Sequence, residues 1–139
     1  MKKILIIGER GFIGKHLYKY LKKFFNLKKI SLKDLKKFKN KVNNFDFIIN
    51  SSINKNYIFK KYNEKFDNDY KVSKFIDNQK TIYCFISTRK VYPSKSNLTE
   101  KSRLSPKSHY SKNKLITEKK ISKKLKNIFL ILRVSNIIG

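Results

Sequence analysis

The 139-residue chain is long enough for one domain with a hydrophobic core and too short for two ordinary domains. Its 40% of apolar residues exclude a disordered polymer, and no apolar stretch approaches the length needed to cross a bilayer. The formal net charge is +26, but the lysines are spread along the whole chain, so we rank a nucleic-acid-binding domain below a globular domain with a solvated, lysine-rich surface.

Short apolar runs alternate with longer amphipathic stretches in the first half of the chain. A continuous run of β-branched and aliphatic residues indicates a strand buried on both faces, and apolar residues three to four apart indicate a helix. These patterns predict a strand over residues 4–7, a glycine turn over 8–14 and a helix over 13–25. A short strand over 28–32, a polar helical or irregular segment over 34–43 and a buried strand over 45–50 follow.

The second half of the chain continues the same alternation. Ile58, Tyr62, Phe66 and Tyr70 step by four and predict one long helix that runs on to residue 76. Lys114, Thr117, Ile121 and Leu125 form one stripe of a later helix. The predicted elements are a long helix over residues 58–76, a strand over 81–87 and a loop over 89–109, followed by a helix over 110–126 and a strand over 128–134.

Alternation of apolar, non-alternating strands with helices predicts the fold class. Such strands belong to a parallel sheet that is covered by helices on both faces. We therefore expect an α/β, Rossmann-like, doubly wound domain over residues 1–139, with no internal repeat or domain boundary.

The first predicted turn carries the pattern G-x-x-G-x-x-G at Gly8, Gly11 and Gly14. It follows a strand and opens a helix, which is the context in which such a loop holds the pyrophosphate of a dinucleotide. The helix N-terminus there offers N–H groups without intrahelical acceptors and the positive end of the helix dipole. Three of the four glycines in the chain lie in this turn, so we favour a dinucleotide-binding loop over a glycine turn without a ligand.

Tyr110 and Lys114 lie four residues apart on a predicted helix and therefore share one face. A fixed ammonium near a tyrosine stabilises the phenolate and lowers its pKa, which suits the tyrosine to proton exchange with a substrate. The pair alone is a weak signal in a chain with 8 tyrosines and many lysines, where a surface helix explains the same spacing.

Three segments join the glycine loop in a resemblance to the extended short-chain dehydrogenases/reductases, the group of NAD-dependent sugar epimerases, dehydratases and reductases. Residues 85–93 (FISTRKVYP) resemble a strand-end motif in which Ser/Thr residues precede a Val-Tyr pair. Glu100, Pro106, Tyr110 and Lys114 follow at a suitable distance, and residues 133–139 (RVSNIIG) resemble a later R-x-x-N-x-x-G segment. The four motifs occur in the family's order and span essentially the whole chain.

The resemblance implies a role for each matching residue. Thr88 would hydrogen-bond the reacting substrate oxygen, Tyr110 would act as general acid/base, and Lys114 would bind the nicotinamide ribose and tune the tyrosine. Asn136 matches an asparagine that contacts substrate, and Asn68 matches a structural asparagine. The residues implied in binding NAD or NADP are Gly8, Arg10, Gly11, Phe12, Ile13, Gly14, Asn50, Ser51, Ser52, Tyr110 and Lys114.

Two departures from the family pattern bear on the cofactor and the substrate. Relatives usually end the second strand in an acidic residue that holds the adenosine ribose; here Asp34 is the nearest acid, while Ser31 and Lys33 are compatible with a 2′-phosphate. NAD and NADP therefore both stay open. Relatives also continue into a C-terminal region that forms most of the sugar site, so we expect that region to be absent from this chain.

Three functional hypotheses follow. The first is an NAD(P)-dependent epimerase, dehydratase or reductase that acts on a nucleotide-linked sugar by hydride transfer. For such an enzyme we expect a cytoplasmic location, and a homodimer stays open. The second is a truncated, non-catalytic NAD(P)-binding remnant or subunit, and the third is a basic nucleic-acid-binding domain.

No metal is expected, because His16 and His109 lack partners at ligand spacing, and Cys84, the only cysteine, is expected to be a small buried hydrophobe.

Overall fold

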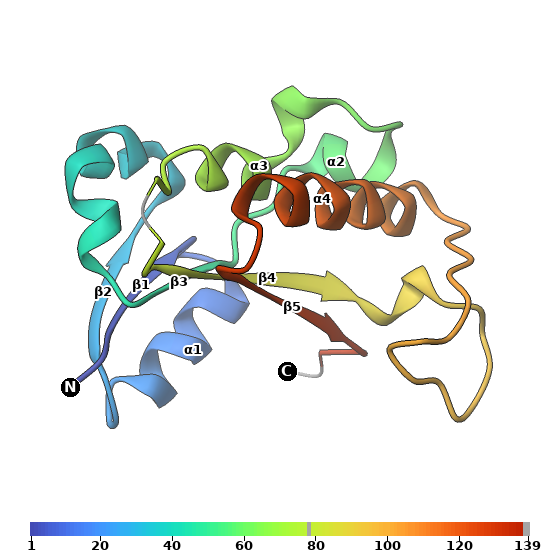
Figure 1. Cartoon of the computed structure of the whole chain (residues 1–139), viewed down its shortest axis with the longest axis horizontal. Helices are drawn as coiled ribbons and strands as arrows, with labels where there is room; N and C mark the ends of the chain where they lie inside the picture. Colours follow the sequence, from blue (N-terminus) through green and yellow to red (C-terminus); the bar gives the residue numbers. More distant parts are fainter. Residues whose placement is uncertain (78, 138–139) are drawn as a thin grey trace.

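The computed structural model describes residues 1–77 and 79–137 and is built on a parallel sheet of five strands (Figure 1). The spatial order is β2-β1-β3-β4-β5, and every neighbouring pair is parallel. The strands are β1 (Lys3–Ile7), β2 (Asn26–Ile30), β3 (Phe47–Asn50), β4 (Ile82–Thr88) and β5 (Phe129–Val134). The predicted parallel, doubly wound architecture is confirmed.

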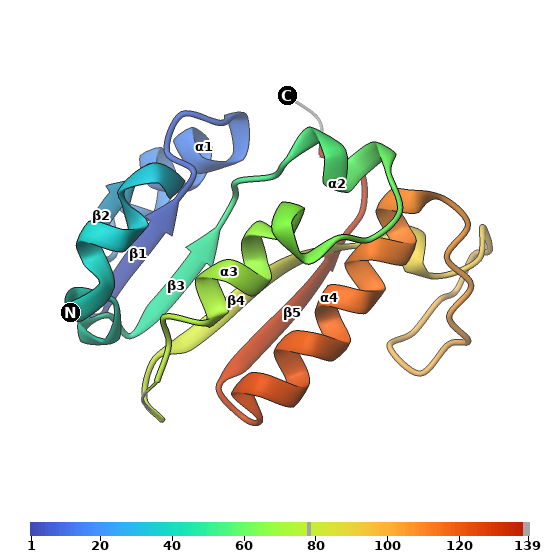
Figure 2. The same cartoon turned by 90° about the horizontal axis from the view of Figure 1, so that it is seen from above.

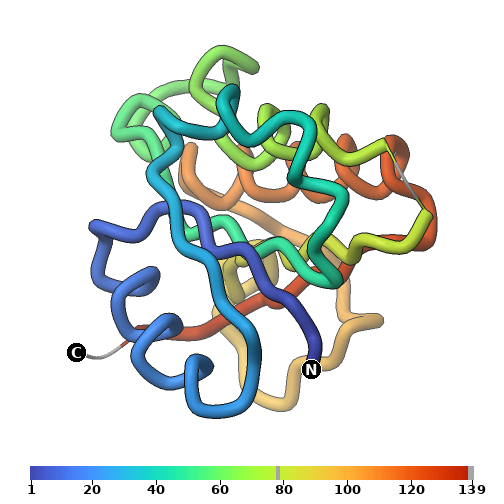
Figure 3. Tube along the Cα trace, turned by 90° about the vertical axis from the view of Figure 1, so that its left-hand side faces the viewer, coloured from blue at the N-terminus to red at the C-terminus, as the bar shows by residue number. Residues whose placement is uncertain are grey.

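Helical segments cover the two faces of this sheet unequally. One helix, α1, lies on one face, and the other helices lie on the opposite face (Figures 1 and 3). The α-helices are α1 (Phe12–Leu21), α2 (Lys55–Phe59), α3 (Asn68–Ser73) and α4 (His109–Leu125). Shorter-pitched 3-10 segments are η1 (Leu32–Asn44), η2 (Glu64–Phe66) and η3 (Arg89–Val91).

The core lies between the sheet and the layer formed by η1, α3 and α4 (Figure 2). Central strands contribute fully buried residues such as Leu5, Ile48 and Phe85, and α4 contributes Ile121 and Leu125. The predicted stripe on α4 is confirmed, because Lys114 and Thr117 are buried along with these two apolar residues. Cys84 is also buried, as expected of a thiol inside an apolar strand.

The single long helix predicted over residues 58–76 is wrong. Three short helices occupy this stretch because polar side chains cap new helices inside it. Asn54 accepts from the Asn56 N–H at 2.8 Å, Asn63 from the Lys65 N–H at 3.0 Å, and Asp67 from the Tyr70 N–H at 2.9 Å. Lys60 is extended and ends α2. The apolar steps of four thus come from separate turns that face the same core.

Other boundaries differ by a few residues. The helix that begins near Ile13 ends at Leu21 rather than reaching Phe25, because the chain must turn so that the Asn26 N–H can bond the Lys2 carbonyl and start β2. That strand therefore occupies Asn26–Ile30 rather than residues 28–32.

Among residues 1–77 and 79–137, no helix combines the length and the apolar composition that a bilayer span requires.

Capping at Asp67 gives a first testable prediction. This carboxylate is fully buried and also accepts from the hydroxyls of Tyr62 (2.8 Å) and Thr117 (2.7 Å), so Asp67→Ala leaves several donors unpaired. We expect the free energy of unfolding to fall by about 3 kcal/mol in a urea titration followed by circular dichroism. The exposed cap Asn63 is the control, since Asn63→Ala should cost only about 1 kcal/mol. Equal losses would contradict this account.

Candidate functional site

Parallel pairing brings the carboxyl ends of four strands to one edge of the sheet. Ile7 pairs with Asn50, Asn50 with Phe85, and Thr88 with Val134. A cavity of about 510 Å³ opens at this edge. Eight residues predicted from the sequence line it: Ile13, Asn50, Ser51, Ser52, Thr88, Tyr110, Lys114 and Asn136.

The glycine turn joins β1 to α1 beside this cavity. Gly8 has φ +94°, a backbone conformation that L side chains rarely adopt, and a side chain there would also lie 2.7 Å from the Ser52 nitrogen. A Cβ on Gly14 would lie 2.3 Å from the Gly8 carbonyl oxygen, so only glycine lets α1 approach the end of β1 this closely. A Cβ on Gly11 would meet only that oxygen, at 3.5 Å.

The first turn of α1 begins directly after Gly11 and contains no acidic side chain. Its amide groups have no intrahelical acceptors, and the dipole places partial positive charge there. Gly8, Arg10, Gly11, Phe12 and Gly14 do not line the cavity itself; they form the turn next to it, and Ile13 alone reaches in from this segment. The turn therefore has the conformation, the space and the charge that suit a diphosphate.

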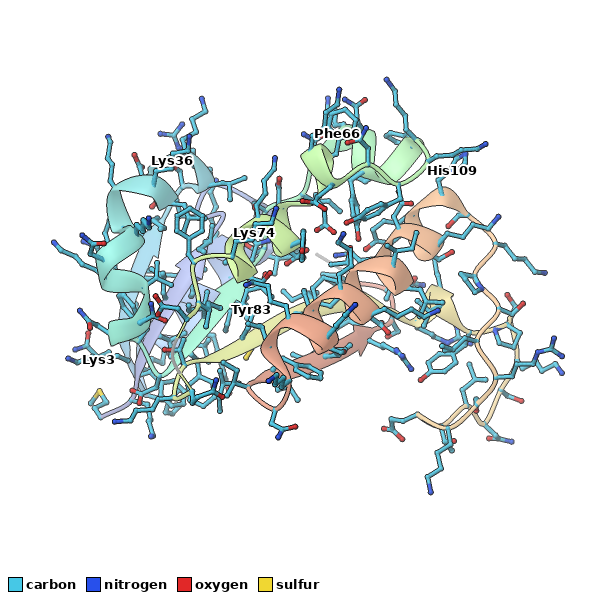
Figure 4. The ribbon with its side chains drawn as sticks, turned by 45° about the horizontal axis from the view of Figure 1, so that its top comes forward. Lys3, Lys36, Phe66, Lys74, Tyr83 and His109 are labelled. Atoms are coloured by element: carbon cyan, nitrogen blue, oxygen red, sulfur yellow. The ribbon has the colours of Figure 1, made fainter. Side chains whose placement is uncertain are left out.

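Helix α4 carries Tyr110 and Lys114 toward the cavity from its first turns. Ser108 caps the helix by accepting from the Ser111 N–H at 3.1 Å, and His109 marks its beginning in Figure 4. The Lys114 ammonium donates to the Ile86 carbonyl at 2.8 Å and lies 5.8 Å from the centre of the Tyr110 ring. The two side chains thus share a face, as their spacing predicts.

The pKa of Tyr110 differs from the sequence-based expectation. Burial raises this pKa above the usual tyrosine value, and the carboxylate of Asp69 raises it further. The Lys114 ammonium does not reverse this, because it is turned toward the Ile86 carbonyl and toward Asp69, 3.7 Å away. Tyr110 is therefore a neutral phenol at neutral pH.

Thr88 and Ser87 end β4 but have different surroundings. Thr88 lines the cavity, and its oxygen accepts from the Lys90 N–H at 3.2 Å, which leaves its hydroxyl hydrogen available. Ser87 points away and donates to Glu118 at 2.5 Å. The geometry thus distinguishes Thr88 as the hydroxyl that can reach a ligand.

The end of β3 continues the polar wall of the cavity. Asn50 accepts from both the N–H and the hydroxyl of Ser52, at 3.0 and 2.6 Å. Ser51 donates to the Ile7 carbonyl at 2.9 Å and so ties this segment to the glycine turn. Asn68 donates to the Ser52 hydroxyl at 3.3 Å, which places it behind the site rather than in it.

The end of β2 holds Asp34 in local contacts. Ser31 donates to this carboxylate at 2.8 Å, and the Lys37 ammonium lies 3.4 Å from it. The hydrogen bond from Ser31, followed by that from Lys37, lowers the pKa of Asp34. Asp34 is thus a half-buried anion beside basic residues, a setting that does not separate NAD from NADP.

The chain was compared with protein-family models, with curated proteins and with solved structures. No protein-family model matches the chain, and no curated protein matches it. Solved structures do. A dTDP-4-dehydrorhamnose reductase from Clostridium acetobutylicum is 25% identical, with a TM-score of 0.70 over 94% of this chain and 52% of that one. This chain has the fold of the extended short-chain dehydrogenases/reductases.

Two further structures extend the likeness. A UDP-glucuronic acid 4-epimerase from Bacillus cereus in complex with NAD is 21% identical, with a TM-score of 0.73 over 99% of this chain and 57% of that one. A dTDP-4-dehydrorhamnose reductase from Bacillus anthracis in complex with NADP is 17% identical, with a TM-score of 0.76 over 96% and 53%. The chain therefore spans about half the length of these short-chain dehydrogenase/reductase structures.

Sequence reasoning missed several cavity residues of this short-chain dehydrogenase/reductase fold. The most consequential is Asp69, which is buried between α3 and the sheet. Its one sequence signal is its rarity, as one of only 9 acidic residues in a strongly basic chain. The others come from the strand ends and from the segments that follow them: Ile53, Ile58, Ile86, Arg89, Lys90, Val134, Ser135 and Ile137.

The predicted R-x-x-N-x-x-G segment is described only through residue 137, so its Gly139 lies outside the described residues. Arg133 forms a bidentate pair with buried Glu118, at 3.0 and 2.7 Å, and donates to the Tyr92 hydroxyl. This contact locks the end of β5 to α4. Asn136 follows on the cavity wall.

The Glu118–Arg133 pair gives a second prediction. Glu118→Gln leaves the buried end of Arg133 without its counter-charge, and the free energy of unfolding should fall by about 3 kcal/mol. Glu100→Gln makes the same chemical change on an exposed loop and should alter it by less than about 0.5 kcal/mol. Urea denaturation measures both, and a similar small effect in each variant would show that the pair contributes little.

Proposed function

We propose that this chain is the dinucleotide-binding, catalytic part of an NAD(P)-dependent enzyme that epimerises, dehydrates or reduces a nucleotide-linked sugar by hydride transfer. The observation that carries the proposal is one arrangement: Thr88, Tyr110 and Lys114 line a single cavity, and Ile13 of the glycine turn lines it as well. The solved structures with this fold include epimerases and reductases of sugar nucleotides with NAD or NADP, which supports the general kind of enzyme.

The residues of the glycine turn fit a dinucleotide. Gly8 and Gly14 leave space that a Cβ at either position would fill, and the first turn of α1 contains no acidic side chain. In this proposal Gly8, Arg10, Gly11, Phe12, Ile13 and Gly14 hold the pyrophosphate, while Asn50, Ser51 and Ser52 flank the rest of the cofactor. When bound, the cofactor supplies hydride-transfer chemistry.

The protein's part of the reaction is proton transfer and orientation. The Thr88 hydroxyl donates a hydrogen bond to the reacting oxygen of the substrate, and Asn136 contacts the substrate further out. Tyr110 gives its phenol proton to that oxygen when a carbonyl is reduced, and the tyrosinate formed by that transfer takes the proton back when a hydroxyl is oxidised. Lys114 holds the cofactor's ribose next to Tyr110. The substrate itself is proposed only as a class.

Alanine at two glycines tests the cofactor site and gives a third prediction. Gly11 has an ordinary φ of −75° and room for a Cβ, so Gly11→Ala should keep the parent's melting temperature. It should nevertheless weaken NAD or NADP binding at least tenfold, because the new methyl group lies where the pyrophosphate approaches. Gly14→Ala should lower both stability and binding, since its Cβ would meet backbone at 2.3 Å.

Isothermal calorimetry with each dinucleotide and thermal melts give the two readouts. Unchanged dinucleotide affinity in Gly11→Ala would contradict the proposal that this turn holds the pyrophosphate. No binding of either dinucleotide by the parent chain, at concentrations well above those that saturate ordinary dehydrogenases, would overturn the proposal itself.

Phenylalanine at Tyr110 gives a fourth prediction. Tyr110→Phe should bind dinucleotide like the parent and lose about 10²- to 10⁴-fold in the rate of hydride exchange with nucleotide-linked sugars. Tyr20→Phe removes a hydroxyl from a side chain that is 65% exposed and should change neither property. Dinucleotide binding without turnover in the parent would instead favour a non-catalytic binding subunit, the second hypothesis from the sequence.

A further inference from the structure

The catalytic lysine of the proposed site has a buried partner that the functional assignment does not use. The Lys114 ammonium lies 3.7 Å from the Oδ2 atom of Asp69, and the two side chains are only 6% and 7% exposed. An ion pair so far from water is costly unless both members are held by further hydrogen bonds. Both are held in this way.

The carboxylate of Asp69 accepts on its other oxygen from two elements of the sheet. Tyr83 on β4 donates its hydroxyl at 2.6 Å, and Asn50 at the end of β3 donates its amide at 2.9 Å. Figure 4 shows Tyr83 on the sheet beneath the helices. Asn50 also binds Ser52 on the cavity wall, so Asp69 is joined to the site on two sides.

The ammonium of Lys114 is equally confined. It donates to the Ile86 carbonyl at 2.8 Å and lies 4.6 Å from the centre of the Phe85 ring. The rings of Tyr57 and Tyr110 are 5.7 and 5.8 Å away. Aromatic faces attract a cation but do not neutralise it, so Asp69 is the group that supplies the counter-charge.

We propose that Asp69 is the positioning residue of this site: its carboxylate holds the Lys114 ammonium against the sheet and offsets its charge next to Tyr110. The role in catalysis rests on the proposed function, but the contacts and the charge balance do not. Lys114 is therefore a pre-positioned ligand for the cofactor rather than the group that ionises Tyr110 on its own.

The charges around Tyr110 support this assignment. Burial raises the pKa of Asp69 above the usual aspartate value, while the Lys114 ammonium and the donors Tyr83 and Asn50 oppose that rise. The ionised form of Asp69 is the one that these contacts stabilise, because a cation and two hydrogen-bond donors face its carboxylate. Of the other charged groups nearby, Asp67 precedes Asp69 by two residues on the same segment, and Arg89 and Lys90 reach the cavity from η3.

Titration of Tyr110 tests the proposal without any dinucleotide. Tyrosines labelled with ¹³C at Cζ report each phenol by NMR, and loss of one signal in Tyr110→Phe assigns the resonance. We expect Asp69→Asn to lower the pKa of Tyr110 by about one pH unit, because the ammonium of Lys114 is then no longer offset. Asp77→Asn makes the same change at an exposed position and should leave that pKa in place.

An equal pKa of Tyr110 in the parent and Asp69→Asn would overturn the proposal. A merely structural aspartate would change the melting temperature without shifting this one resonance. Because neither readout requires a cofactor, failure to bind dinucleotide would overturn the proposed function while leaving this result intact.

Lys114→Gln provides an independent measurement if Asp69→Asn does not fold. This variant leaves the Asp69 carboxylate buried without a cation, which raises its folded-state pKa further above the unfolded value. For an acid whose pKa is raised by folding, stability is present at low pH and is lost as pH rises. The urea midpoint of Lys114→Gln should therefore fall more steeply than the parent's between about pH 5 and about pH 8. Parallel profiles would contradict the pairing.

Discussion

Parallel, in-register strand pairing is the constraint on which the rest of this molecule depends. It aligns the ends of β1, β3, β4 and β5, so that a glycine turn, a serine-rich segment, a threonine and an asparagine meet although they are far apart in sequence. The loops of such a sheet can carry ligand-binding groups because the strands below them are rigid. Helix α4 then needs only to lie across β4 and β5 to bring Tyr110 and Lys114 to the same edge.

Much of this arrangement follows from local patterns in the sequence. Buried strands such as β1 and β4 are continuous apolar runs, and the glycine turn contains two positions, Gly8 and Gly14, whose backbone or packing tolerates no side chain. The α4 stripe could be predicted even though it contains Lys114, since the spacing of Thr117, Ile121 and Leu125 fixes the buried face.

The failures of prediction have physical causes of a different kind. Apolar residues four apart in the region of α2 and α3 suggest one helix, because apolar periodicity carries no information on caps. Lys60 ends α2, and Asn63 and Asp67 cap the helical segments that follow. Asp69 could not be assigned because its partners come from β3, β4 and α4, and their meeting is a property of the tertiary structure. Burial raises the pKa of Tyr110 and the Asp69 carboxylate raises it further, and both effects arise from the tertiary structure, so a lysine four residues away could not predict the direction.

The placement of the acids has a consequence for the outer surface. Asp67, Asp69 and Glu118 are buried, which removes a third of the 9 acidic residues from a chain with 35 lysines and arginines. The outside of the molecule is consequently left with almost one sign of charge, and close lysines repel one another wherever no carboxylate intervenes. Dissolved anions screen this repulsion, so the folded state of such a chain depends on the ionic strength of its medium more than that of a protein with balanced surface charge.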